Sequence, residues 1–128
     1  MSVAIQLEHV TKQFGSGHAA VTALRDVSLR VPEGALVVVA GPSGSGKTTL
    51  LHLVGGLDTP TAGRIEAAGL DLTQRSERAL SRYRRQRVGF IFQQFNLLGD
   101  LTVRENIELP LALNGSPGRA ARVAGLLE

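Results

Sequence analysis

The chain has 128 residues, of which 43% are hydrophobic and 20% are charged, and its formal net charge at pH 7 is +3. This composition is typical of one soluble globular domain or part of one. The absence of cysteine excludes disulfides, thiol catalysis and cysteine metal sites. We expect no signal peptide, because no basic segment precedes a long apolar one, and no membrane span, because no apolar run approaches about 18 residues.

Strands are predicted for the first part of the chain. Residues 5–10 and residues 27–31 alternate apolar with polar side chains, which is typical of strands with one buried face. Pro32-Glu33-Gly34 then predicts a tight turn. Residues 36–40, LVVVA, are apolar throughout, so we expect a strand that is buried on both faces, as parallel strands are.

A glycine-rich loop and two helices follow. The loop leads into a helix over residues 48–54, which a pair of glycines ends. A short strand is predicted at residues 64–67. Ser76 is a candidate N-cap of a helix over residues 76–86, and residues 88–92 predict another strand.

The last part of the chain is predicted to be helical. Thr102 is expected to cap a helix that runs through Leu109 and that Pro110 closes. Residues 115–118 predict a break, and residues 119–128 begin a further helix.

One motif carries chemistry. Residues 41–48, GPSGSGKT, fit the phosphate-binding pattern G-x-x-x-x-G-K-[ST] completely. Its glycines let the backbone curl so that N–H groups point at phosphate oxygens, and the following helix directs its positive dipole at the same place. Lys47 is expected to reach the β- and γ-phosphates, and the Thr48 hydroxyl to bind Mg²⁺. The alternative is a flexible Gly/Ser turn, but the motif lies between a predicted strand and a predicted helix, as phosphate binding requires.

Two longer stretches carry a family resemblance. Residues 88–111, VGFIFQQFNLLGDLTVRENIELPL, resemble the Q-loop region of ABC-transporter ATPase subunits, and residues 23–72 resemble their Walker A half. Within the family, the sequence most resembles the branch that serves lipoprotein-releasing and macrolide-export (LolD- and MacB-like) systems. The resemblance implies an α/β P-loop NTPase fold of ABC type, with an antiparallel β-subdomain plus the start of the parallel core sheet. The chain would be one partial ATP-binding domain, with its helical subdomain beginning at about residues 102–128.

The resemblance also assigns roles to residues. Gln93, the first glutamine after FIF, occupies the Q-loop position, whose side chain in the family contacts Mg²⁺ and the attacking water. Phe14 occupies the place where the family stacks an aromatic ring on adenine. Taken alone, Gln93 could instead end a buried strand and Phe14 could belong to the core. Lys47 and Gln93 are the expected catalytic residues, Thr48 and Gln93 the expected metal ligands, and the other expected phosphate ligands are Gly41, Ser43, Gly44, Ser45, Gly46 and Thr49.

Other motifs of the family do not occur in these residues. The nearest string to the LSGGQ-like signature is LVGGLD at residues 53–58, which ends the helix after the phosphate loop. No aspartate has the apolar context of Walker B. We therefore interpret the chain as truncated before the signature and Walker B, and we expect negligible hydrolysis by it alone. Because the strands beside residues 36–40 would come from the absent half, we also expect poor solubility.

The expected function is ATP-driven transport, with ATP and Mg²⁺ as cofactors. The resemblance implies a transmembrane permease subunit that meets the Q-loop region, a homodimer of the full-length protein, and a cytoplasmic location on the inner face of the cell membrane. One alternative is a truncated, non-catalytic remnant that only binds nucleotide. A kinase or GTPase is disfavoured because an Asn-Lys-x-Asp motif is missing. Nucleic-acid binding would rest on six arginines in residues 75–87, which we interpret as a solvated helix face.

Overall fold

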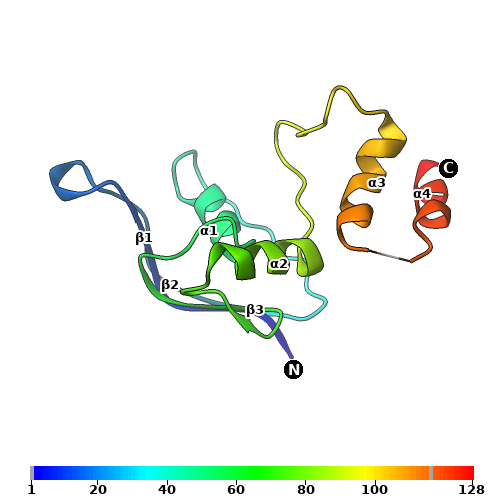
Figure 1. The fold of residues 1–128 in the computed structure, drawn as a ribbon. Helices are drawn as coiled ribbons and strands as arrows, with labels where there is room; N and C mark the ends of the chain where they lie inside the picture. The colour runs from blue at the N-terminus through cyan, green and yellow to red at the C-terminus, as the bar shows by residue number, and fades with distance from the viewer. Residues whose placement is uncertain (1, 116) are drawn as a thin grey trace. The chain divides into compact units, whose positions relative to one another are not determined.

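The structure is a computed structural model that describes residues 2–115 and 117–128. It divides into two compact units, Met1–Arg84 and Arg85–Glu128, which are described separately (Figure 1). None of the helices in the described part of the chain is both long enough and apolar enough to cross a membrane.

A four-stranded sheet forms the base of the first unit. Its strands are β1 (Val3–Phe14), β2 (Val21–Pro32), β3 (Ala62–Ala67) and β4 (Leu70–Asp71), in the order β2-β1-β3-β4. The pairings are antiparallel, with Leu7 opposite Leu29 on one side and Ile65 on the other. The strands predicted at residues 5–10 and 27–31 are thus confirmed, and each is longer than predicted, at 12 residues. A 3₁₀ turn, Gly17–Ala19, lies between them.

Two helices lie on one side of this sheet: α1 (Lys47–Val54) and α2 (Glu77–Arg87), whose last residues belong to the second unit (Figure 1). Leu53 of α1 and Ile65 of β3 are fully buried. Tyr83 of α2 donates its hydroxyl proton to the carbonyl oxygen of Val54 at 2.9 Å. A Cβ on Gly56 would come within 2.8 Å of the Tyr83 ring, so the glycine after α1 allows α2 to pack closely. The core therefore lies where α1 meets the sheet and α2.

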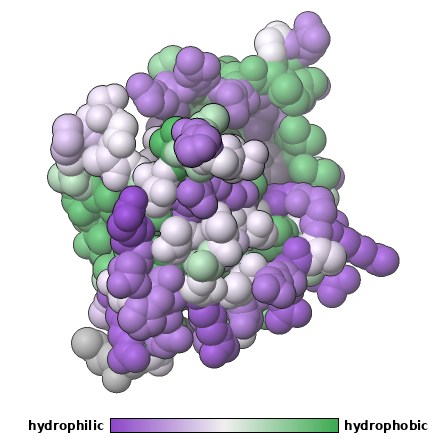
Figure 2. All heavy atoms as spheres, turned by 90° about the vertical axis from the view of Figure 1, so that its left-hand side faces the viewer, coloured by the Kyte–Doolittle hydropathy of each residue, from purple (hydrophilic) through white to green (hydrophobic). Residues whose placement is uncertain are grey.

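The expected buried strand at residues 36–40 is wrong. These residues form no strand with any described segment, and Leu36 and Val38 are 94% and 83% exposed. The described strands of the first unit pair antiparallel, which confirms the expected antiparallel β-subdomain, and residues 36–40 add no parallel strand to them. The physical reason is that a strand needs a neighbour to accept its backbone hydrogen bonds, and no described segment pairs with this one. The face shown in Figure 2 is mainly hydrophilic (purple) or intermediate (white), with hydrophobic areas (green) toward its margins.

The second unit holds two helices, α3 (Val103–Leu113) and α4 (Arg119–Leu127), which pack together around the buried Val123. The strand expected at residues 88–92 is also wrong: this segment is irregular, and Ile91 is fully exposed. Phe90 and Phe92 instead stack on each other, with 5.4 Å between ring centroids.

Thr102 caps α3 as expected, and Glu105 completes a capping box. However, Pro110 does not close the helix but lies inside it. A proline inside a helix loses the hydrogen bond that its own nitrogen would donate, and its ring crowds the carbonyl group four residues before it, so it disfavours a helix without preventing one. The helix continues to Leu113, and the N–H of Asn114 donates to the carbonyl oxygen of Pro110 at 3.1 Å.

Candidate functional site

The glycine-rich loop at residues 41–46 contacts the sheet through its last residue, Gly46. Gly44 and Gly46 have φ angles of +79° and +91°, which are in the left-handed region that favours glycine. A Cβ on Gly46 would overlap the carbonyl oxygen of Ala23 and come within 2.9 Å of the Leu24 side chain, both in β2. The last glycine of the motif therefore brings the loop against β2 at the point where α1 begins.

Lys47, the first residue of α1, folds back over this loop. Its Nζ donates to the carbonyl oxygens of Gly41 at 2.6 Å and Pro42 at 2.7 Å, and it lies 3.3 Å from Ser45 Oγ. Residues 41–45 are exposed, whereas Lys47 is half-buried. The side chain thus holds a positive charge beside an accessible loop, where an anion can approach it.

The N-terminus of α1 is open toward the same loop. Its N-cap, Gly46, supplies no side-chain hydrogen bond, and the first turn carries no acidic residue. The first N–H groups of a helix have no acceptor within the helix, and they form the positive end of its dipole. The first N–H groups of α1 and the ammonium of Lys47 are therefore hydrogen-bond donors beside the same exposed loop.

Two hydroxyl side chains of the first turn complete this loop. Thr48 is exposed and Thr49 is half-buried. In the described residues, no group of three or more His, Cys, Asp or Glu side chains gathers to hold a metal ion. A single hydroxyl ligand nevertheless fits Mg²⁺ bound with a nucleotide, because that ion takes most of its six oxygen ligands from water and phosphate.

The structure places Phe14 and Gln93 in different units. Phe14 is the last residue of β1, and 45% of it is exposed, which excludes the core interpretation. Lys12 Nζ lies 5.0 Å from the centroid of its ring, so a cation already faces the aromatic system. Gln93 lies in an exposed turn of the second unit, and not at the end of a buried strand. The first unit therefore contains both the phosphate loop and Phe14, whereas Gln93 belongs to the second unit.

A partly buried ion pair near α1 was not expected from the sequence. Lys12 Nζ on β1 donates to Asp58 Oδ1 at 2.9 Å and to the carbonyl oxygen of Thr59 at 2.8 Å, and the lysine side chain is only 13% exposed. Burial raises the pKa of Asp58, but hydrogen bonds from Lys12 and the Thr59 N–H outweigh it, so the pKa is lowered overall. The pair ties the chain after α1 to β1, and its two residues are too far apart in sequence for any local pattern to reveal it.

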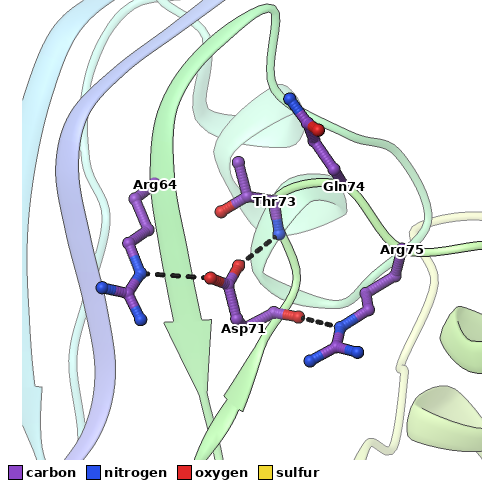
Figure 3. Close-up of a pocket in the computed structure, with 5 residues that line it drawn as sticks. All are labelled: Arg64, Asp71, Thr73, Gln74 and Arg75. Carbon is purple, nitrogen blue, oxygen red and sulfur yellow. Dashed lines mark hydrogen bonds and ion pairs between the residues drawn. The ribbon is translucent and has the colours of Figure 1, made fainter.

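An open hollow of about 380 Å³ lies beside β3 and β4 (Figure 3). At its centre, Asp71 accepts hydrogen bonds from the N–H of Thr73 at 2.9 Å and from Arg64 Nε at 3.1 Å. Chiefly the Thr73 N–H lowers the pKa of Asp71. Because the polar groups that line the hollow form hydrogen bonds with one another, we interpret them as stabilising the turn after β4 rather than as a binding site. It contains none of the expected site residues, and its lining residues are Arg64, Asp71, Thr73, Gln74 and Arg75.

Comparison with known proteins relates this site to one family. The sequence model of a family described as ABC transporter matches residues 24–128. An uncharacterized ABC transporter ATP-binding protein of Thermotoga maritima is 44% identical over 100% of this chain and 56% of its own length. The methionine import ATP-binding protein MetN of Geobacillus kaustophilus is 48% identical over 97% of this chain and 36% of its own. The macrolide export ATP-binding/permease protein MacB of Marinobacter nauticus is 42% identical over 96% of this chain and 19% of its own length.

A solved structure is similar as well. It is the dimeric, post-hydrolysis state of an ATP-binding cassette bound to ADP and Pi, with a TM-score of 0.87 and 38% sequence identity. The match covers 94% of this chain and 54% of the other. The chain thus spans about half the length, or less, of the relatives that it matches.

Proposed function

Because the chain belongs to the ABC transporter family, we propose that it binds Mg-ATP at residues 41–48 as part of the ATP-binding subunit of a transporter. The observation that carries this proposal is the geometry of the phosphate loop. Lys47 Nζ lies within 2.7 Å of two loop carbonyl oxygens, and the helix that starts there has no side-chain cap. Phosphate oxygens would bind the ammonium and the free N–H groups together.

The roles of single residues are part of the same proposal. Lys47 binds the β- and γ-phosphates, Thr48 holds Mg²⁺, and Phe14 stacks on the adenine through its exposed face. Bound Mg²⁺ neutralises phosphate charge. Gln93 acts from the second unit, as a metal contact and by orienting the attacking water. Gly41, Ser43, Gly44, Ser45, Gly46 and Thr49 contribute further phosphate contacts.

For the whole protein we propose ATP hydrolysis coupled to transport. In this scheme residues 1–128 are a partial ABC ATP-binding domain, with Walker A at 41–48, the Q-loop near residue 93 and the helical subdomain starting at about 102–128. A transmembrane permease subunit meets the Q-loop region, and two copies form a dimer, as the solved ATP-binding cassette does. The subunit works in the cytoplasm, on the inner face of the membrane.

The proposed transport type is lipoprotein release or macrolide or peptide export. A second candidate is methionine import, which the 48% identity to a methionine import protein favours. Chimeric cassettes distinguish the two: residues 1–128 replace the matching part of a macrolide exporter or of a methionine importer. We expect restored macrolide resistance and no restored methionine uptake, and the opposite result would select the import type.

A binding titration tests the nucleotide site. We expect Lys47→Ala to weaken Mg-ATP binding by roughly 10- to 100-fold, which corresponds to the loss of a charged hydrogen bond. Arg30→Ala removes the same charge from an exposed position on β2 and should leave the affinity unchanged. Thermal unfolding of both variants checks that the loop is still folded. Equal ATP affinity of the wild-type chain and Lys47→Ala would refute the site.

A turnover assay separates catalysis from binding alone. We expect the purified chain to bind Mg-ATP but to hydrolyse it negligibly, which is also the behaviour of a non-catalytic remnant. Phosphate release that Lys47→Ala abolishes would contradict this expectation, because it would show that the chain contains a complete catalytic site.

A further inference from the structure

The positive charge of the chain is concentrated in one segment. Residues 75–87 contain six arginines and one glutamate, which gives this segment a net charge of +5. Since the whole chain carries +3, the remaining residues together carry −2. The excess of positive charge therefore lies in α2 and in the two residues before it. The six arginines are Arg75, Arg78, Arg82, Arg84, Arg85 and Arg87.

Packing fixes the orientation of this helix. Leu80 and Tyr83 are buried, and the Tyr83 hydroxyl is bonded to Val54. Arg84 Nη1 donates to the carbonyl oxygen of Gly56 at 2.6 Å, and its Nη2 pairs with Glu77. The one acidic residue of the segment is therefore used by an arginine that faces the core, and α2 cannot rotate without losing these contacts.

Three of the other arginines lie on the opposite side of α2. Arg78, Arg82 and Arg85 have i, i+4 and i+7 spacing, which places them within an arc of roughly 60°. All three are exposed, and none forms an ion pair with a residue that the structure describes. Arg75 precedes the helix, is also exposed, and uses its Nε for the carbonyl oxygen of Asp71. We call Arg75, Arg78, Arg82 and Arg85 the arginine face.

We propose that the arginine face docks against the anionic phospholipid headgroups of the membrane surface. The inference rests on the proposed function, which places the chain beside a membrane. A plane of lipid phosphates is a continuous anionic surface, and arginines on a fixed helix can approach it together without any pocket.

The composition of the arginine face favours lipid over a protein partner. Stable protein interfaces need a buried apolar or aromatic centre. In residues 75–87 the large apolar side chains are Leu80 and Tyr83, and both are buried. Nor does the face offer an aromatic ring for stacking on single-stranded bases. What it presents is charge alone, which suits headgroup phosphates.

Vesicle sedimentation tests the proposal with the full chain. The vesicles are phosphatidylcholine with and without about one third phosphatidylglycerol. We expect the chain to bind the anionic vesicles and to be released by salt. Each arginine near such a surface is worth about fivefold in partitioning, so Arg78→Gln with Arg82→Gln should weaken binding about 25-fold. Arg78→Lys with Arg82→Lys should retain it.

A matched control removes the same charge elsewhere. Arg25→Gln with Arg30→Gln alters two exposed arginines of β2 and should change vesicle binding far less. The proposal is overturned if this control and the Arg78/Arg82 pair lose binding equally, or if neutral vesicles bind the chain as well as anionic ones. Displacement of the chain from vesicles by stoichiometric duplex DNA would assign the arginine face to nucleic acid instead.

The same samples separate this inference from the proposed function. Lys47→Ala should lose Mg-ATP affinity and keep its vesicle binding. A wild-type chain that binds vesicles but not Mg-ATP would refute the nucleotide site alone. A chain that binds Mg-ATP but not anionic vesicles would refute the membrane contact alone.

Discussion

Gly46 shows how one residue positions the phosphate loop. Because of its φ of +91° and the overlap that a Cβ would make with the carbonyl oxygen of Ala23, a side chain at this position would force the loop or β2 to shift. We expect Gly46→Ala to lower the free energy of unfolding by about 1–3 kcal/mol and to weaken Mg-ATP binding. Chemical denaturation and an ATP titration measure the two effects.

Gly44→Ala is the matched control for this substitution. Gly44 also has a positive φ of +79°, but a Cβ there would meet no atom within 4 Å. The cost should therefore be the backbone strain alone, about 1 kcal/mol. If Gly44→Ala destabilised the chain as much as Gly46→Ala, contact with β2 would not be what positions the loop.

Asp58 makes the stability of the first unit depend on pH. Its pKa is lowered on folding, so its contribution is fully present above the pKa of the unfolded state, near 3.8, and is lost as the pH falls through the lower folded-state pKa. We expect Asp58→Asn to cost about 1 kcal/mol at pH 7, after allowance for its partial exposure. The difference from wild type should shrink below about pH 4. A constant difference down to pH 2 would contradict the ion pair with Lys12.

These residue-scale features differ in how far the sequence predicts them. The phosphate loop is contiguous, and its spacing alone predicts the place of Gly46 and Lys47. Lys12 and Asp58 meet only because β1 and the chain after α1 fold together. No local pattern encodes such a contact.

At the scale of elements, a strand is predictable from sequence when its partners are close by. β1 and β2 form a hairpin, so alternation identifies them and their pairing follows. Residues 36–40 are at least as apolar, but hydrophobicity indicates burial without supplying a neighbour to pair with, and the expected strand is absent from the described structure. The predicted end of the helix at Pro110 likewise followed from the usual effect of proline, whereas α3 continues through this residue.

The capping box of α3 gives a test at this scale. The N–H of Glu105 donates to Thr102 Oγ1 at 3.2 Å, and Glu105 in turn accepts from the N–H of Thr102 at 2.7 Å. We expect Thr102→Ala to destabilise α3 by about 1 kcal/mol, which far-UV circular dichroism would show as lost helix. Thr102→Ser keeps the hydroxyl and should retain the helix. Identical spectra for both variants would show that the cap is dispensable.

At the scale of the whole molecule, exposed apolar side chains are expected to limit the solubility of the chain. Leu36 and Val38 are almost fully exposed in a run of four large apolar residues, and such a patch favours association. We expect Leu36→Ser with Val38→Ser to raise the soluble concentration without lowering the unfolding temperature. Leu53→Ser, in the core, should lower that temperature instead. A large loss of stability in the double variant would mean that residues 36–39 are packed.

Amide hydrogen exchange with and without Mg-ATP tests the central claim most directly. If the loop and the first turn of α1 bind phosphate, the N–H groups there gain phosphate acceptors beyond the existing bond from the Ser45 N–H to Pro42. Residues 43–49 should then exchange more slowly with Mg-ATP present. The protection should disappear in Lys47→Ala. Unchanged exchange in this segment at saturating Mg-ATP, or protection confined to other parts of the chain, would contradict the account.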